Sequence, residues 1–156
     1  MPKITGFLHA ENDASHIERA LESLKVCDEL IVIDEGSKDD TEKLARSFGA
    51  TVKKAISGVS TGAYVMDSRN DWVLVLRPNE ELNEELIATL ENWKQADHEE
   101  SGFAFEVAER KGEDGWCKHV AEMRLVNRKK INWVGELPPN NTMALKLPGD
   151  ILRYPE

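Results

Sequence analysis

Three short polar segments in this 156-residue chain each follow an apolar run, and their side chains are suited to binding a polar ligand. Carboxylate and amide oxygens accept hydrogen bonds from the N–H and O–H groups of a ligand without needing a metal ion. The segments contain Glu11, Asn12 and Asp13; then Asp34, Glu35, Ser37 and Asp39; then Arg77, Asn79 and Glu80. Asn12, Asp13 and Asp39 are also typical helix caps. Asp34 and Glu35 are two adjacent acids that do not help a strand to pack, which favours a ligand role for them.

The apolar patterns predict the elements that would position these segments. Strands are predicted at 3–8, 30–33, 51–53, 72–76, 103–107, 122–126, 131–134 and 143–147. Helical spacing predicts helices beginning near Asp13, near Asp40 and at Asn83, with Gly49 ending the second, and a short helix within the loop 55–70. This order predicts an α/β fold, in which a mixed sheet has a parallel N-terminal half flanked by helices.

The edge of that sheet is where a ligand is expected. In open α/β sheets, ligands bind outside the carboxyl ends of the strands, which is where all three polar segments fall. His9 ends the first predicted strand, so it is also a candidate for ligand contact, whereas the four histidines have no metal-ligand spacing. The acidic run Glu80, Glu81, Glu84 and Glu85 is interpreted as a solvated face at a helix start.

The chain from Ile4 to about Glu81 resembles the nucleotide-binding half of family 2 glycosyltransferases with the GT-A fold. The likeness is strongest to the bacterial branch for lipopolysaccharide core and cell-surface polysaccharide. The matching segments are Asn12-Asp13, 17–24, Asp28 to Thr41 and 71–76, with weaker matches at 123–128, Trp133-Val-Gly135 and 151–155.

The resemblance implies a single GT-A-like domain over 1–156. Residues 1–100 would be its nucleotide-binding half and 101–156 a short β-rich acceptor-side half. Asp34, Glu35 and Asp39 would bind the base and ribose, and Asn12, Asp13 and Asn79 would also contact the substrate. The implied partner is a nucleotide sugar such as a UDP-sugar or GDP-sugar. Because the β-rich half is short, we expect a homodimer or a partner that completes the cleft.

Two family motifs are changed in this chain. The family holds Mg²⁺ or Mn²⁺ with a D-x-D motif, and hard cations prefer charged oxygen ligands. The chain has Leu76-Arg-Pro-Asn-Glu80 there, so no metal site of the family type is expected. The family also has an acid after Trp-Val-Gly that activates the acceptor, and Glu136 is the nearest base here, followed by two prolines within three residues.

Arg77 has three interpretations. A guanidinium binds phosphate oxygens bidentately, so Arg77 would offset charge on a departing diphosphate in place of the cation, with Glu136 as the other catalytic residue. Alternatively, Arg77 marks the loss of catalysis and leaves a non-catalytic nucleotide-binding or protein-interaction module. A third interpretation pairs Arg77 with Glu80 or Glu81 at the surface.

The composition narrows the partners further. A net charge of −9 disfavours nucleic acid and anionic membrane surfaces, which would repel the chain. The apolar runs are too short to span a bilayer and no signal core is evident, so we expect a cytoplasmic protein without membrane insertion. Cys27 and Cys117 lack CxxC spacing, which favours two partly buried free thiols.

Overall fold

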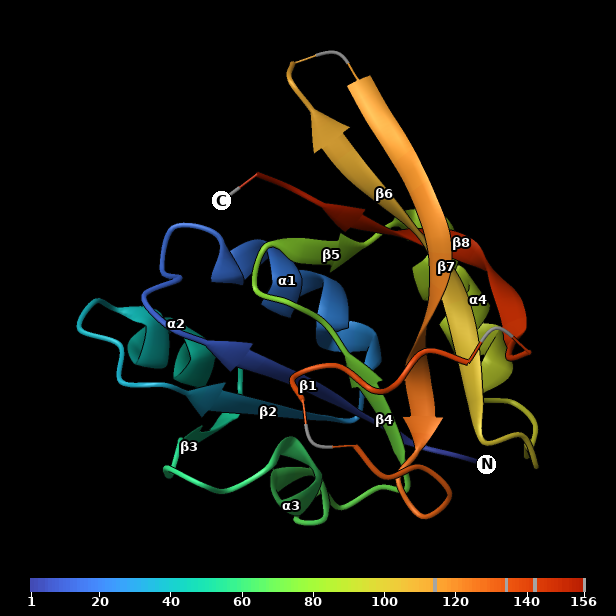
Figure 1. Cartoon of the computed structure of the whole chain (residues 1–156), viewed down its shortest axis with the longest axis horizontal. Helices are drawn as coiled ribbons and strands as arrows, with labels where there is room; N and C mark the ends of the chain where they lie inside the picture. The colour runs from blue at the N-terminus through green and yellow to red at the C-terminus, as the bar shows by residue number, and fades with distance from the viewer. Residues whose placement is uncertain (114, 134, 142, 156) are drawn as a thin grey trace.

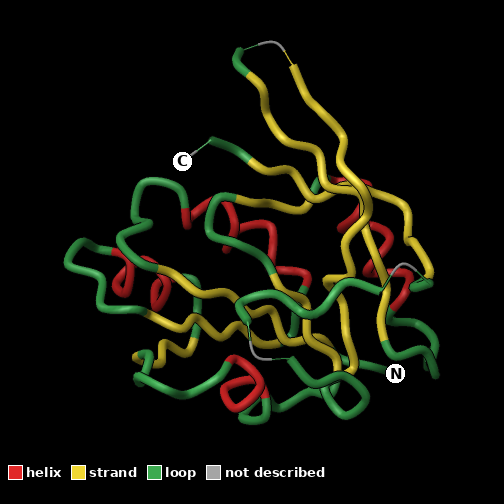
Figure 2. The backbone as a smooth tube through the Cα atoms, in the orientation of Figure 1, coloured by secondary structure: helices red, strands yellow, loops and turns green. Residues whose placement is uncertain are grey.

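The computed structural model describes every residue except 114, 134, 142 and 156, and within that part eight strands form one mixed sheet (Figures 1 and 2). The strands are β1 Ile4–Ala10, β2 Glu29–Asp34, β3 Thr51–Lys54, β4 Trp72–Val75, β5 Glu80–Leu82, β6 Gly102–Lys111, β7 Gly115–Asn127 and β8 Leu145–Arg153. The helices are α1 Ile17–Ser23, the 3-10 turn η1 Leu24–Val26, α2 Thr41–Ser47, α3 Thr61–Val65 and α4 Glu84–Trp93. Their spatial order in the sheet is β3-β2-β1-β4-β7-β6-β8-β5.

The N-terminal half of the sheet is parallel. β1 lies between β2 and β4, and β3 pairs with β2, all in parallel register. Because parallel strands end at the same edge, the segments after β1, β2 and β4 come together there. β4 then pairs antiparallel with β7, which begins the C-terminal half.

Alternate residues of the central strands pack into two hydrophobic clusters, one on each face of the sheet. Ile4 and Leu8 of β1 share a cluster with α1, α2 and α4. Phe7 belongs to the other cluster, which contains α3 and Trp133. The sheet is therefore covered on both faces, as the continuous apolar runs predict.

Local signals in the sequence explain where the helices begin and end. Asn83 caps α4, since its side-chain oxygen accepts a hydrogen bond from the backbone N–H of Leu86 at 2.9 Å. Gly49 has a φ of 84°, the left-handed conformation that commonly ends a helix such as α2.

The C-terminal half consists of a long hairpin and a returning strand. β6 and β7 pair antiparallel along their length, and their distal end extends beyond the rest of the molecule in Figure 1. β8 lies parallel to β6, and β5 closes the sheet by pairing antiparallel with β8. β5 and β8 thus join the segment after β4 to the C-terminal strand.

The predicted fold class is confirmed, and four local predictions are wrong. Residues 131–133 form no strand, and residue 134 lies outside the described residues. The last strand begins at Leu145, not 143. Glu80 is fully buried in β5, so this part of the acidic run is not a solvated face. Cys117 is exposed, whereas Cys27 is half-buried as expected. In the described part of the chain, no helix is long and apolar enough to cross a bilayer.

Candidate functional site

A cavity of about 400 Å³ lies at the edge where the parallel strands end. It is formed by the ends of β1 and β2, the turn between β4 and β5, and the segment around residue 136. Its lining residues are His9, Ala10, Glu11, Asn12, Asp13, His16, Glu35, Arg77, Pro78, Asn79 and Glu136. The three polar segments singled out in the sequence therefore all contribute to one cavity.

In the first segment, Asn12 and Asp13 line the cavity and also fix the loop. Asn12 has a positive φ of 54°, and its side-chain oxygen accepts a hydrogen bond from the backbone N–H of Lys38 at 2.8 Å. Asp13 binds the backbone N–H of Glu11 at 2.8 Å and the His16 ring at 2.9 Å. The Asn12–Lys38 contact thus holds the loop after β1 against the loop after β2, and the Asp13 contacts fix the first loop itself.

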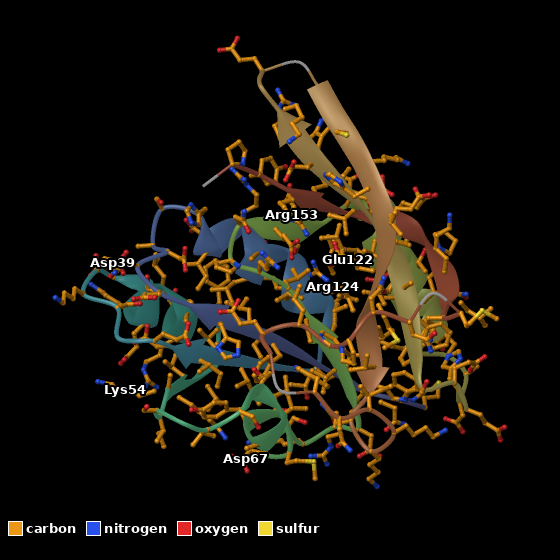
Figure 3. The ribbon with its side chains drawn as sticks, viewed as in Figure 1. Asp39, Lys54, Asp67, Glu122, Arg124 and Arg153 are labelled. Atoms are coloured by element: carbon orange, nitrogen blue, oxygen red, sulfur yellow. The ribbon has the colours of Figure 1, made fainter. Side chains whose placement is uncertain are left out.

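In the second segment, only Glu35 of the three acids lines the cavity. Asp34 is buried and accepts a hydrogen bond from the backbone N–H of Ser37 at 3.2 Å. Asp39 is exposed at the periphery of the molecule (Figure 3) and accepts hydrogen bonds from the backbone N–H groups of Thr41 and Ala14. The hydrogen bond from the Thr41 hydroxyl also lowers the pKa of Asp39. Asp39 therefore binds backbone N–H groups beside the start of α2, whose N-cap residue is Asp40.

In the third segment, Arg77 and Asn79 differ in what they contact. The Arg77 side chain is exposed in the cavity wall, and within the described residues its guanidinium forms no ion pair. Its backbone N–H donates to the Glu80 carboxylate at 2.8 Å. Asn79 is buried. Its side-chain amide N–H donates to the Tyr154 backbone carbonyl at 2.8 Å, and its backbone carbonyl accepts from the Tyr154 N–H at 2.9 Å.

Glu80 belongs to a buried ionic network that also contains Arg124, Arg153 and Glu122. Arg124 is fully buried and donates both terminal nitrogens to Glu80, at 2.7 and 3.0 Å. Arg153 donates its Nε to Glu80 at 3.0 Å, and both arginines also contact Glu122. Figure 3 shows Glu122, Arg124 and Arg153 gathered at the centre of the molecule.

This network shifts the pKa values of Glu80 and Arg124. Burial alone would raise the pKa of Glu80, but the hydrogen bonds and charge of Arg124 outweigh it and the pKa is lowered. Burial alone would lower the pKa of Arg124, but the hydrogen bonds and charge of Glu80 outweigh it and the pKa is raised.

The proposed surface pairing of Arg77 with Glu80 or Glu81 is wrong, because Glu80 pairs with the two other arginines and Glu81 accepts from the Tyr154 hydroxyl.

The residues at the altered metal motif do not fit a divalent cation. Arg77 is itself cationic, the Asn79 amide is committed to Tyr154, and the Glu80 carboxylate is neutralised by two guanidiniums. Across the described residues, no three His, Cys, Asp or Glu side chains are grouped as a metal site would require. The donor set thus leaves a single cation, Arg77, at this wall of the cavity.

Arg124 is the residue that the sequence analysis missed. It interrupts the apolar strand segment 122–126, and a charged residue in a buried strand is a signal for an internal ion pair. Glu136 is exposed and lines the same cavity, and its role as a base stays a prediction.

Some bacterial proteins are similar to this chain in sequence. An uncharacterized glycosyltransferase of Rickettsia bellii is 34% identical over 109 residues, which cover 67% of this chain and 37% of the relative. A similar protein of Rickettsia felis is 33% identical over 111 residues, covering 69% of this chain and 39% of the relative. The chain therefore spans less than two fifths of the length of these relatives. No model of a known protein family matches it.

Solved structures resemble the chain in fold. Staphylococcus aureus TarS (residues 1–349) aligns with a TM-score of 0.56 at 16% identity, over 72% of this chain and 38% of that one. Glucosyl-3-phosphoglycerate synthase of Mycobacterium tuberculosis, in complex with Mn²⁺, UDP and glucosyl-3-phosphoglycerate, aligns with a TM-score of 0.50 at 25% identity, over 71% and 45%. The chain is a glycosyltransferase-like protein with a mixed α/β sheet of the GT-A type.

Proposed function

We propose that the chain binds a nucleoside diphosphate sugar, such as a UDP-sugar or GDP-sugar, in the cavity at the carboxyl ends of β1, β2 and β4. The observation that carries this proposal is that Glu35 and Arg77 line the same cavity from strands on either side of β1. Glu35 supplies an acceptor for the N–H of a base, and Arg77 supplies a cation for the diphosphate. The likeness to a synthase solved with UDP supports this choice of ligand.

The same cavity suggests how the sugar would be transferred. An acceptor hydroxyl attacks the anomeric carbon, the bond from that carbon to the diphosphate oxygen breaks, and the electron pair leaves on the diphosphate. Arg77 stabilises the charge that develops there, because its guanidinium offers two parallel N–H donors and has no competing ion pair within the described residues. Glu136 accepts the proton from the attacking hydroxyl.

A second candidate is a nucleotide-binding or protein-interaction module that does not transfer sugar. It is favoured by one observation: Asp34, Asp39 and Asn79, all expected to contact the substrate, are hydrogen-bonded within the protein. A released-UDP assay with candidate acceptors separates the two functions, since only the first predicts turnover.

The binding proposal is tested by calorimetric titration with UDP and GDP, in EDTA and again with Mn²⁺. We expect binding in EDTA that Mn²⁺ does not strengthen, and a loss of about tenfold in Arg77→Gln, the scale of one charge-assisted contact. Arg46→Gln is the matched control, because Arg46 is an exposed arginine on α2 that does not line the cavity. Binding that requires Mn²⁺, or no binding to either nucleotide, would refute the proposal.

A further inference from the structure

His9 lies in the wall of the candidate cavity and is mostly enclosed. Its side chain is 11% exposed, on a strand whose neighbouring residues are buried and apolar. The ring meets Phe7 and Tyr64 edge-on, with centroids 5.6 and 6.5 Å away. A histidine here needs partners for its nitrogens, because an unpaired buried polar group costs free energy.

The two ring nitrogens face different partners. Nε2 lies 3.1 Å from the Thr61 hydroxyl oxygen. Nδ1 lies 3.9 Å from Oε1 of Glu35 and has no hydrogen-bond partner among the residues described. A hydroxyl both donates and accepts, whereas a carboxylate only accepts. The arrangement that suits both neighbours has Thr61 donating to Nε2 and the ring proton on Nδ1, directed at Glu35.

This environment favours the neutral form of the ring. Burial lowers the pKa of His9, and the opposing charges of Glu35 and Glu136 only partly offset it. A neutral ring carries one proton, so the hydrogen bond from Thr61 to Nε2 determines that Nδ1 carries it. The distance of 3.9 Å is longer than a hydrogen bond. The Glu35 side chain is 39% exposed, and contacts of this kind often tighten only when a ligand binds.

We infer that His9, held in the Nδ1–H tautomer by Thr61, is a positioning residue that orients the Glu35 carboxylate towards a ligand N–H. This inference rests on the proposed function and adds a preference among nucleobases. With one carboxylate oxygen occupied by His9, the other accepts a ring N–H, which uracil and guanine carry. Neutral cytosine and adenine have a ring nitrogen lone pair in that place, and it repels a carboxylate. The site therefore selects uridine or guanosine diphosphates over cytidine and adenosine diphosphates.

The tautomer is tested without any ligand by the ring ¹⁵N chemical shifts of His9 at pH 7.5. Free histidine favours the Nε2–H form. An Nδ1–H signature would therefore show that the protein, through Thr61, determines the tautomer of His9. We expect that signature in the wild type and its loss in Thr61→Val, which removes the hydroxyl donor. The signals are assigned by their absence in His9→Asn. An Nε2–H ring in the wild type would overturn the inference.

The selectivity is tested by titrating UDP and CDP in EDTA. We expect the wild type to prefer UDP by about tenfold or more, His9→Leu to lose that preference, and His9→Asn to keep it, because an Asn amide N–H can replace Nδ1–H. His119→Asn, an exposed histidine on the hairpin, is the control. Equal binding of UDP and CDP by the wild type, or an unchanged preference in His9→Leu, would overturn the selectivity. If no nucleotide binds, the proposed function and the selectivity fail together, while the ring shifts still decide the tautomer.

Discussion

Replacing Glu80 by Gln should destabilise the chain more than its small chemical change suggests. Each carboxylate oxygen of Glu80 accepts two hydrogen bonds. Oε1 accepts from the Arg77 backbone N–H and from Arg124, and Oε2 accepts from Arg124 and Arg153. A Gln side chain puts an NH₂ group in place of one oxygen, in either orientation. The NH₂ group of Gln then faces two N–H donors from which the replaced oxygen accepted. Arg124 and Arg153 also lose their fully buried counter-ion and keep only the partly exposed Glu122.

The expected loss follows from this geometry. Hydrogen bonds to charged groups contribute about 1.5–3 kcal/mol each, and breaking a fully buried ion pair on one side costs about 3–5 kcal/mol. Glu80 and Arg124 are both 0% exposed, so solvent does not screen the pair. We therefore expect Glu80→Gln to lose about 3–5 kcal/mol of the free energy of unfolding.

Urea denaturation followed by circular dichroism measures this loss. With a slope of about 2 kcal/mol/M, the midpoint should fall by about 1.5–2.5 M. Glu91→Gln, at an exposed position of α4, is the matched control and should stay within about 0.5 kcal/mol of the wild type. A Glu80→Gln midpoint equal to that of the control would refute the description of the network.

The pH dependence of stability, compared between wild type and Glu80→Gln, gives a second test of the network. Because the folded-state pKa of Glu80 lies below its ordinary value of 4.5, the stability that Glu80 contributes is full above that value and is lost as the pH falls through the folded pKa. The difference in stability between wild type and Glu80→Gln should therefore be constant near pH 7 and shrink below about pH 4.5. A difference that grows in acid would contradict the assignment.

Three further predictions concern other parts of the chain. Burial raises the pKa of the Cys27 thiol to about 12, so a thiol reagent at pH 8 should modify only the exposed Cys117 quickly and Cys27 only on unfolding. Gly149→Ala should destabilise strongly, by more than about 2 kcal/mol in urea denaturation, because Gly149 has a φ of 104° and an added Cβ would lie 2.4 Å from Leu86 Cα. Asn83→Ala should cost about 1 kcal/mol through loss of the α4 cap, measured in the same way, whereas Asn83→Ser should recover most of it.

The parallel half of the fold follows from local patterns in the sequence. The runs that became β2 and β4 are continuous and apolar, and the run that became β1 is apolar enough for a strand. Each is followed by polar residues, so both the strands and the binding edge could be predicted. Helix ends at Gly49 and Asn83 were also predictable, because each has a residue type with one dominant structural role.

The C-terminal half was harder to predict because long-range pairing determines it. β5 is three residues long, and its strand character comes from pairing with β8 about 70 residues later. Glu80 appeared to be solvated because nothing nearby in sequence reveals Arg124 and Arg153, its partners in the folded chain. Likewise, the sequence presents Asp34 and Glu35 as equivalent candidates, and only the folded chain shows that Glu35 lines the cavity while Asp34 is buried.

The affinity difference between UDP and UMP in EDTA, measured for wild type and Arg77→Gln, tests the central claim most directly. The two nucleotides differ only in the terminal phosphate, so the comparison isolates the contact assigned to Arg77. We expect the wild type to prefer UDP by about tenfold and Arg77→Gln to bind UDP and UMP alike. An unchanged preference in Arg77→Gln, or one that appears only with Mn²⁺, would contradict the claim that Arg77 supplies the charge that binds the diphosphate.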